Sequence, residues 1–192
     1  MTQIECYFSV MSPYSYLAMP DLARIAAGVG IRYMPLHFGT LAQRMGSILM
    51  AEATGPRKRW YHQDLPRQAV RRGLALNIQP AFWPGNAAPA SYAIIAAQDQ
   101  GGDVDGLVQT FCRALWAEDR DIADDHVVRE CLAAHGFDAD LADRRMFMAA
   151  ERYAQNLEDA VTKGVFGLPY MIWGDQHFWG QDRLDDLEWA LR

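Results

Sequence analysis

Two serines near the N-terminus have the spacing of a redox-active cysteine pair. They stand in the segment Ser12-Pro13-Tyr14-Ser15, which follows an apolar run and precedes a helical pattern. With cysteine at both positions the segment would read C-P-Y-C, a thiol–disulfide active site. Because disulfide exchange requires thiols, the two hydroxyls argue against that chemistry. Ser12 can instead cap a helix, or it can donate a hydrogen bond to a thiolate that another molecule supplies.

The cysteines of the chain do not replace the missing thiol pair. Cys6, Cys112 and Cys131 are scattered and form no C-x-x-C motif, so neither a disulfide framework nor a zinc knuckle is expected. We expect three buried, reduced thiols. The histidines show no metal-ligand spacing, and we expect structural or surface roles for His37, His62, His126, His135 and His177.

Composition narrows the classes of partner. The 192 residues fit one domain, or one domain with a large insertion, and 51% of them are hydrophobic. The net charge of −6 argues against binding to nucleic acid or to an anionic membrane, both of which favour a basic surface. No apolar run is long enough to span a bilayer, and no signal-peptide pattern is present. A cytoplasmic location is therefore expected.

The elements that must position Ser12 begin with a β-α-β pattern. Residues 3–10 favour a strand, Pro13 opens a helix that runs to about Gly28, and residues 31–36 favour a second strand. A β-α-β unit implies a right-handed crossover and parallel pairing of its strands.

The rest of the chain divides into a helical block and a β-β-α end. The C-terminal end predicts strands over 170–173 and 176–179, joined at Gly174-Asp175 as a hairpin, and then a helix over 184–191. Residues from about 38 to 162 have almost no β-branched runs, and helical periods recur in 57–73, 87–100, 104–118, 124–134 and 139–163.

This order of elements is that of the thioredoxin-like fold with an all-helical insertion, as in the DsbA-like group. The segments S-P-Y-S-Y-L-A, V-F-G-L-P and W-G-Q-D-R-L, together with KRWYHQDLPR, WPGN and WAEDRDI, occur in order along the chain. In these segments the chain resembles the 2-hydroxychromene-2-carboxylate isomerases and the kappa-class glutathione transferases. The resemblance implies an α/β fold with a discontinuous thioredoxin-like domain over 1–37 and 164–192 and a helical insertion over 38–163.

The resemblance also implies a function, a cofactor and an oligomeric state. It implies a glutathione-dependent isomerase, in which the thiolate of bound glutathione adds reversibly to an unsaturated aromatic acid and allows ring opening and cis–trans isomerisation. It further implies a homodimer. Two alternatives stay open: a kappa-like transferase that releases a stable conjugate, and a non-catalytic protein that binds glutathione or another small molecule.

Carried onto this chain, the resemblance implies that Ser12 contacts the thiolate of glutathione and that Leu168 contacts its peptide backbone. The Ser12 hydroxyl would donate a hydrogen bond to the thiolate, with plain helix capping as the alternative, whereas Ser15 is expected to be structural. A cis bond at Leu168-Pro169 would turn the backbone groups of Leu168 toward the Ser12 turn, where they can pair with the peptide like an added strand. The alternative is a proline that merely begins a strand.

The same resemblance implies which residues hold the two charged ends of glutathione. Within Trp179-Gly180-Gln181-Asp182-Arg183, Gln181 and Asp182 would hold the γ-glutamyl group with Arg183 beside it, and the alternative for Asp182 is capping of the last helix. Arg57 or Lys58 would hold the glycyl carboxylate, with a solvated basic face as the alternative.

Four residues are expected on the substrate side. The resemblance places the loop with Asn86 over the substrate pocket, where a buried amide can bind a substrate oxygen; the alternative is an ordinary turn residue. Tyr14, Trp83 and Tyr92 are expected to line an apolar slot, although most aromatic side chains of the chain belong to the core.

Overall fold

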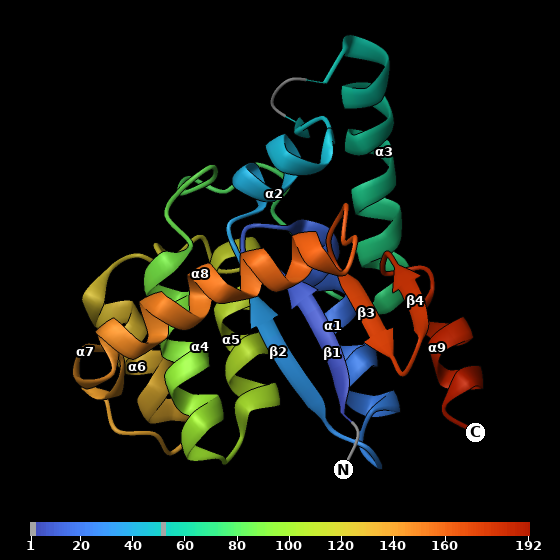
Figure 1. Ribbon diagram of the computed structural model, residues 1–192. Helices are drawn as coiled ribbons and strands as arrows, with labels where there is room; N and C mark the ends of the chain where they lie inside the picture. The colour runs from blue at the N-terminus through green and yellow to red at the C-terminus, as the bar shows by residue number, and fades with distance from the viewer. Residues whose placement is uncertain (1–2, 51–52) are drawn as a thin grey trace.

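A mixed β-sheet lies at the centre of the molecule (Figure 1). The computed structural model describes residues 3–50 and 53–192, and within them the sheet has four strands in the order β2-β1-β3-β4. β1 pairs parallel with β2 and antiparallel with β3, and β3 pairs antiparallel with β4. The predicted β-α-β unit and the C-terminal hairpin are confirmed. The strands are β1 (Ile4–Phe8), β2 (Ile31–Pro35), β3 (Tyr170–Trp173) and β4 (Gln176–Trp179).

The predicted helical block lies between β2 and β3, and its helices differ from the prediction in two places. The eight-residue α2 was not predicted, because so short a helix offers few apolar positions, of which it buries Leu41 and Ala42. The expected helix over 139–163 breaks at Arg145, whose N–H closes the short α7 on Leu141. The helices are α1 (Pro13–Ile25), α2 (Phe38–Met45), α3 (Gly55–Arg72), α4 (Ala88–Gln100), α5 (Val104–Trp116), α6 (Asp125–Ala134), α7 (Leu141–Arg144), α8 (Met146–Thr162) and α9 (Leu184–Ala190).

The two faces of the sheet meet different helices. Side chains alternate along a strand, and in β1 Ile4, Cys6 and Phe8 join the cluster that contains α1, α4 and α5. Tyr7 points to the other face and joins the cluster beneath α2 and α8. In Figure 1, α8 crosses one face of the sheet while α1 lies behind the other. The N-terminus of α1 is thereby held at the carboxyl end of β1.

The helical block also covers one edge of the sheet. The Gln98 side chain on α4 accepts a hydrogen bond from the Tyr33 N–H at 2.6 Å and donates one to the Tyr33 carbonyl at 3.2 Å. An amide side chain thus takes the place of a further strand beside β2, which satisfies backbone groups that an edge strand would leave free. Because one core cluster contains side chains from the sheet and the helices, the division into domains at 37/38 and 163/164 stays a prediction.

Within the described part of the chain, no helix is both long enough and apolar enough to cross a membrane.

Candidate functional site

Two tryptophans hold the backbone of the turn that precedes Ser12. The indole N–H of Trp116 donates to the Val10 carbonyl at 2.9 Å, and that of Trp83 donates to the Met11 carbonyl at 3.0 Å. The two rings also pack against each other, with centroids 5.8 Å apart. Trp83, expected to line a substrate slot, therefore positions the turn that carries the candidate catalytic serine.

Ser12 is the N-cap of α1. Its Oγ accepts a hydrogen bond from the Ser15 N–H at 3.2 Å. A serine hydroxyl has one proton to donate besides its acceptor sites, so capping leaves that proton available. The helix N-terminus adds partial positive charge at the same place, which favours an anion. Capping and donation to a thiolate are thus compatible roles for Ser12, whereas Ser15 is fully buried.

Residues of four separate segments line a cavity of about 320 Å³. They come from α1, from α3, from the residue before Pro169 and from the end of β4 with the turn that follows. Most of the residues predicted to hold glutathione are among them, together with the predicted substrate-side Tyr14. The lining residues are Tyr14, Trp60, Asp64, Gln68, Leu168, Trp179, Gly180, Gln181, Asp182 and Arg183.

The turn after β4 (residues 180–183) is built against Pro169. The Leu168–Pro169 peptide bond is cis, as the resemblance implied. The Gly180 N–H donates to the Pro169 carbonyl at 3.0 Å, which joins the two predicted glutathione segments. Gly180 has φ +108°, and a Cβ there would lie 2.5 Å from an Asp182 carboxylate oxygen. The positive φ favours glycine at this position, where Asp182 folds back over the turn.

A second glycine lets Trp179 form a wall of the cavity. The Trp179 indole lies over Gly167, where an added Cβ would approach the ring nitrogen to 2.4 Å. Phe166 packs edge-on against the same indole, with centroids 4.8 Å apart. Trp179 is still 53% exposed, so its free face is open to a ligand.

The cavity holds two carboxylates in different electrostatic settings. Asp64 accepts hydrogen bonds from the Tyr14 hydroxyl at 3.1 Å and from the Gln68 amide at 3.3 Å. Asp182 lies 3.4 Å from Arg183, and both side chains are more than half exposed. Asp182 makes no capping hydrogen bond to α9, so the alternative reading of this residue as a helix cap is wrong. Burial, followed by the charge of Asp64, raises the pKa of the Tyr14 hydroxyl.

Sequence reasoning missed three residues of the cavity, and a signal for them was present. Trp60, Asp64 and Gln68 all lie on α3 at intervals of four residues. Residues four apart share one face of a helix. The spacing of these polar and aromatic side chains within the predicted helix therefore pointed to one functional face.

Helical spacing also distinguishes Arg57 from Lys58, the two basic candidates for binding the glycyl carboxylate. Arg57 and Lys58 are both exposed and do not line the cavity. Arg57 stands seven residues before Asp64 and so shares its helix face. Its positive charge also reaches Tyr14, where it partly offsets the raised pKa. Of the two, Arg57 lies on the face of α3 that lines the cavity, and its role in holding the glycyl carboxylate stays a prediction.

Besides Trp83, two further predicted substrate residues lie outside this cavity. Asn86 is exposed, contrary to the expected buried amide, and its side-chain oxygen accepts from the Ala88 N–H at 3.0 Å, as a turn residue does. Tyr92 on α4 packs edge-on against Tyr153 on α8 at 5.6 Å. The reason for both differences is the path of the chain, since Asn86 stands in the turn just before α4 and Tyr92 packs against α8.

The protein's own thiols are protonated and enclosed. Cys6, Cys112 and Cys131 are free and buried, as predicted. Burial raises the pKa of Cys112 to about 12 and that of Cys131 to about 11, and it raises the pKa of Cys6 further. Because the thiolate is the nucleophilic form, these cysteines are inert at neutral pH. Within residues 3–50 and 53–192, no group of three or more acidic, histidine or cysteine side chains is arranged to hold a metal ion.

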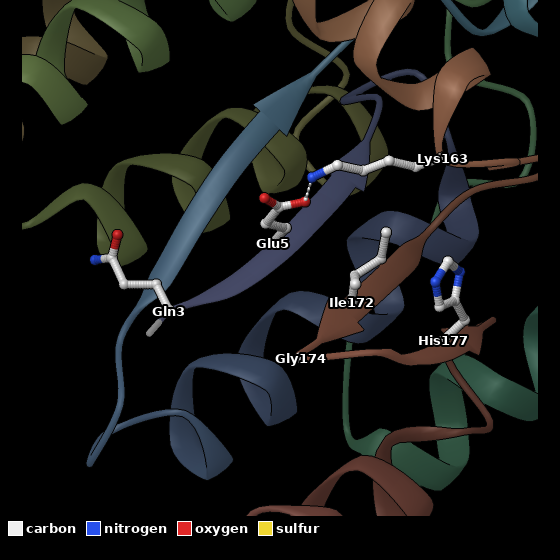
Figure 2. Close-up of a pocket in the computed structure, with 6 residues that line it drawn as sticks. All are labelled: Gln3, Glu5, Lys163, Ile172, Gly174 and His177. Atoms are coloured by element: carbon white, nitrogen blue, oxygen red, sulfur yellow. Dashed lines mark hydrogen bonds and ion pairs between the residues drawn. The ribbon is translucent and has the colours of Figure 1, made fainter. Parts of the chain in front are cut away.

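A second cavity of about 280 Å³ lies on the sheet below the end of α8 (Figure 2). Lys163, just after α8, forms an ion pair with Glu5 of β1. The residues that line this second cavity are Gln3, Glu5, Lys163, Ile172, Gly174 and His177. None of these was a predicted site residue.

Comparison with known proteins agrees with the fold described above. A family model described as the DSBA-like thioredoxin domain matches residues 3–192. A 2-hydroxychromene-2-carboxylate isomerase of Sphingobium xenophagum is 31% identical over 192 residues, covering 96% of this chain and 95% of that protein. Glutathione S-transferase kappa 1 of Caenorhabditis elegans is 26% identical, covering 95% of this chain and 88% of its own. A solved structure of a 2-hydroxychromene-2-carboxylate isomerase superimposes with a TM-score of 0.81 at 27% identity, covering 98% of this chain and 93% of its own.

Proposed function

The chain belongs to the DsbA-like thioredoxin-domain family, and from that premise and the geometry of the cavity we propose that it is a glutathione-dependent isomerase of the 2-hydroxychromene-2-carboxylate type. One observation carries the proposal: the cavity beside α1 is lined by most of the residues predicted to hold glutathione, whereas the chain's own thiols are buried and protonated. A sulfur nucleophile at Ser12 therefore has to come from a diffusible ligand.

The residues of the cavity fit the chemistry of glutathione. Its γ-glutamyl end carries an ammonium group beside a carboxylate, and Asp182 and Asp64 present carboxylates to the cavity for the ammonium. Gln181 and Arg183 lie beside Asp182 for the carboxylate. Leu168 lines the cavity next to the cis bond and offers its backbone groups to the peptide. The volume of about 320 Å³ lies at the lower end of the ~300–1,000 Å³ typical of small-molecule sites.

The chemistry depends on a thiolate held near Ser12. Bound glutathione would supply a thiolate that adds reversibly to an unsaturated carbon of an aromatic acid, which permits ring opening and cis–trans isomerisation. Ser12 donates its free hydroxyl proton as a hydrogen bond to that sulfur, and the N-terminus of α1 adds partial positive charge. Both interactions favour the ionised thiol at neutral pH.

The aromatic side chains suit an unsaturated ring substrate. Tyr14 stacks on Trp60 with centroids 6.4 Å apart. Trp60 and Trp179 are about half exposed and line the same cavity. These rings provide an apolar rim, while Trp83 keeps the turn before Ser12 in place.

The test is the Ser12→Ala variant with Ser15→Ala as its matched control. Loss of the hydrogen bond should raise the pKa of bound glutathione and lower glutathione-dependent turnover of a chromene acid about 10–100-fold at neutral pH. Ser15→Ala should leave both unchanged, because the Ser15 hydroxyl has no partner among the described residues. Full glutathione-dependent activity in Ser12→Ala would disprove the role of Ser12.

A second candidate function is a kappa-like transferase, favoured by the similarity to the kappa 1 transferase. Mass analysis of the product separates the two, because an isomerase returns the substrate mass and a transferase adds glutathione to it. A non-catalytic glutathione-binding protein would bind glutathione in a calorimetric titration without turnover of the chromene acid.

The homodimer and the cytoplasmic location remain part of this proposal. Light scattering of the purified chain tests the first, and fractionation of cells that produce it tests the second.

A further inference from the structure

Arg72, the last residue of α3, lies behind the cavity rather than in it. Its side chain is only 14% exposed. One guanidinium nitrogen donates to the Gln68 side-chain oxygen at 2.6 Å, and another donates to the Gln181 carbonyl at 2.9 Å. The remaining nitrogen lies 3.9 Å from the Asp21 carboxylate on α1. Arg72 therefore contacts three parts of the molecule that surround the cavity.

These contacts continue as a chain of hydrogen bonds into the cavity. Gln68 accepts from Arg72 and donates to Asp64, and Asp64 accepts from the Tyr14 hydroxyl. This series of hydrogen bonds thus runs from the turn 180–183 through α3 to the first turn of α1, which begins beside Ser12. It connects the segment proposed to hold the γ-glutamyl group with the segment proposed to hold the thiolate.

The turn 180–183 makes few hydrogen bonds to the rest of the described structure. Within the described residues, two hydrogen bonds connect it with parts of the chain outside β4, the turn itself and α9: the Gly180 N–H to the Pro169 carbonyl, and Arg72 to the Gln181 carbonyl. α9 begins without a side-chain cap. The first bond fixes the turn relative to β3, and the second fixes it relative to α3.

We propose that Arg72 is a positioning residue for the glutathione site, which sets the turn 180–183 at the correct distance from α1 through Gln181 and Gln68. The inference rests on the proposed function. An arginine suits this task because its planar guanidinium presents five N–H donors in a fixed geometry and so serves several acceptors at once, whereas a lysine is a compact point charge.

The experiment compares Arg72→Met and Arg72→Lys with Arg71→Met in the full chain. Arg71 is the exposed neighbour on the same helical turn, so Arg71→Met removes the same charge without the buried contacts. Calorimetric titration with reduced glutathione measures Kd, and the pH dependence of thiolate absorbance measures the pKa of the bound thiol. Thermal unfolding without ligand confirms that each variant is folded at the temperature of titration.

We expect Arg72→Met to raise Kd about tenfold, Arg72→Lys to raise it less, and Arg71→Met to leave it unchanged. The pKa of the bound thiol should stay at the wild-type value in all three, because Ser12 and the start of α1 are intact. A purely structural defect would instead change that pKa together with Kd, and this result would overturn the proposal.

The remaining outcomes separate this inference from the proposed function. Wild-type protein that does not bind glutathione overturns both. Wild-type binding with equal Kd in Arg72→Met and Arg71→Met overturns the positioning role alone. If Arg72→Met does not fold, Arg72→Lys decides the matter, since a wild-type Kd in that variant contradicts the role of the guanidinium.

Discussion

Two cavities of the molecule are each lined by a carboxylate that accepts a hydrogen bond from a tyrosine, and the two carboxylates differ in whether a cation is paired with them. At the candidate site Tyr14 donates to Asp64, and at the second cavity the buried Tyr7 donates to Glu5, both at 3.1 Å. Glu5 is paired with Lys163 (Figure 2), whereas Asp64 is bonded only to uncharged groups among the described residues.

The difference bears on which of the two carboxylates has its charge available to a cationic ligand group. A carboxylate that already has a cationic partner gains little from a second cation. A partly buried carboxylate bonded only to uncharged groups keeps its charge available to an ammonium group. The ion pair across the second cavity therefore joins the end of α8 to β1 as a structural contact, and the charge of Asp64, which is unpaired among the described residues, supports the binding role proposed for it.

The largest expected effect tests that contrast directly. Asp64→Asn keeps an acceptor for Tyr14 but removes the charge, so glutathione should bind about 10–100-fold more weakly. Glu5→Gln is the matched variant in the second cavity and should bind glutathione as the wild type does. Calorimetric titration of both proteins decides the point, and equal weakening in the two variants would remove the distinction between the cavities.

A second prediction concerns alkaline pH. The pKa values of Tyr14 and Tyr7 are raised, first by burial and then by Asp64 and Glu5. A raised pKa in the folded state contributes stability that is complete below the unfolded value, near 10, and is lost as pH rises toward the folded value. The free energy of unfolding should therefore fall above about pH 10, by up to about 1.4 kcal/mol per pH unit for each tyrosine.

Urea unfolding at about pH 9 and about pH 11 measures this loss, and Tyr14→Phe and Tyr7→Phe should each reduce it. Asp64→Asn should lower the pKa of Tyr14 alone, and Glu5→Gln that of Tyr7 alone. A loss that neither phenylalanine variant changes would show that other groups cause it.

The smallest expected effect belongs to Lys163. The ion pair is partly exposed, with Lys163 at 40% and Glu5 at 23%, and such pairs contribute less than about 1 kcal/mol. Lys163→Met should lower Tm by no more than about 2–4 °C and leave glutathione affinity unchanged. A double-mutant cycle with Glu5→Gln isolates the pair, and a coupling of several kcal/mol would contradict its assignment as a surface contact.

Motifs that are continuous in sequence were predicted well. The turn around Ser12, the cis Leu168–Pro169 bond and the segment Gly180-Gln181-Asp182 each carry their signal within a few residues, and the fold class followed from their order. Residues whose role depends on distant partners were not predicted. Trp83 was expected in a substrate slot, but its indole N–H meets a carbonyl 72 residues away.

The sequence by itself determined the N-cap serine, the lack of a thiol pair, the β-α-β and hairpin elements and the family. All of these follow from local backbone preference or from contiguous motifs. Only the tertiary structure decided that one face of α3 joins the cavity, that Asp64 has no cationic partner among the described residues and that Arg72 reaches the Gln181 carbonyl. The physical reason is that hydrogen bonds and charge pairing depend on distances across the fold, and a linear sequence does not contain those distances.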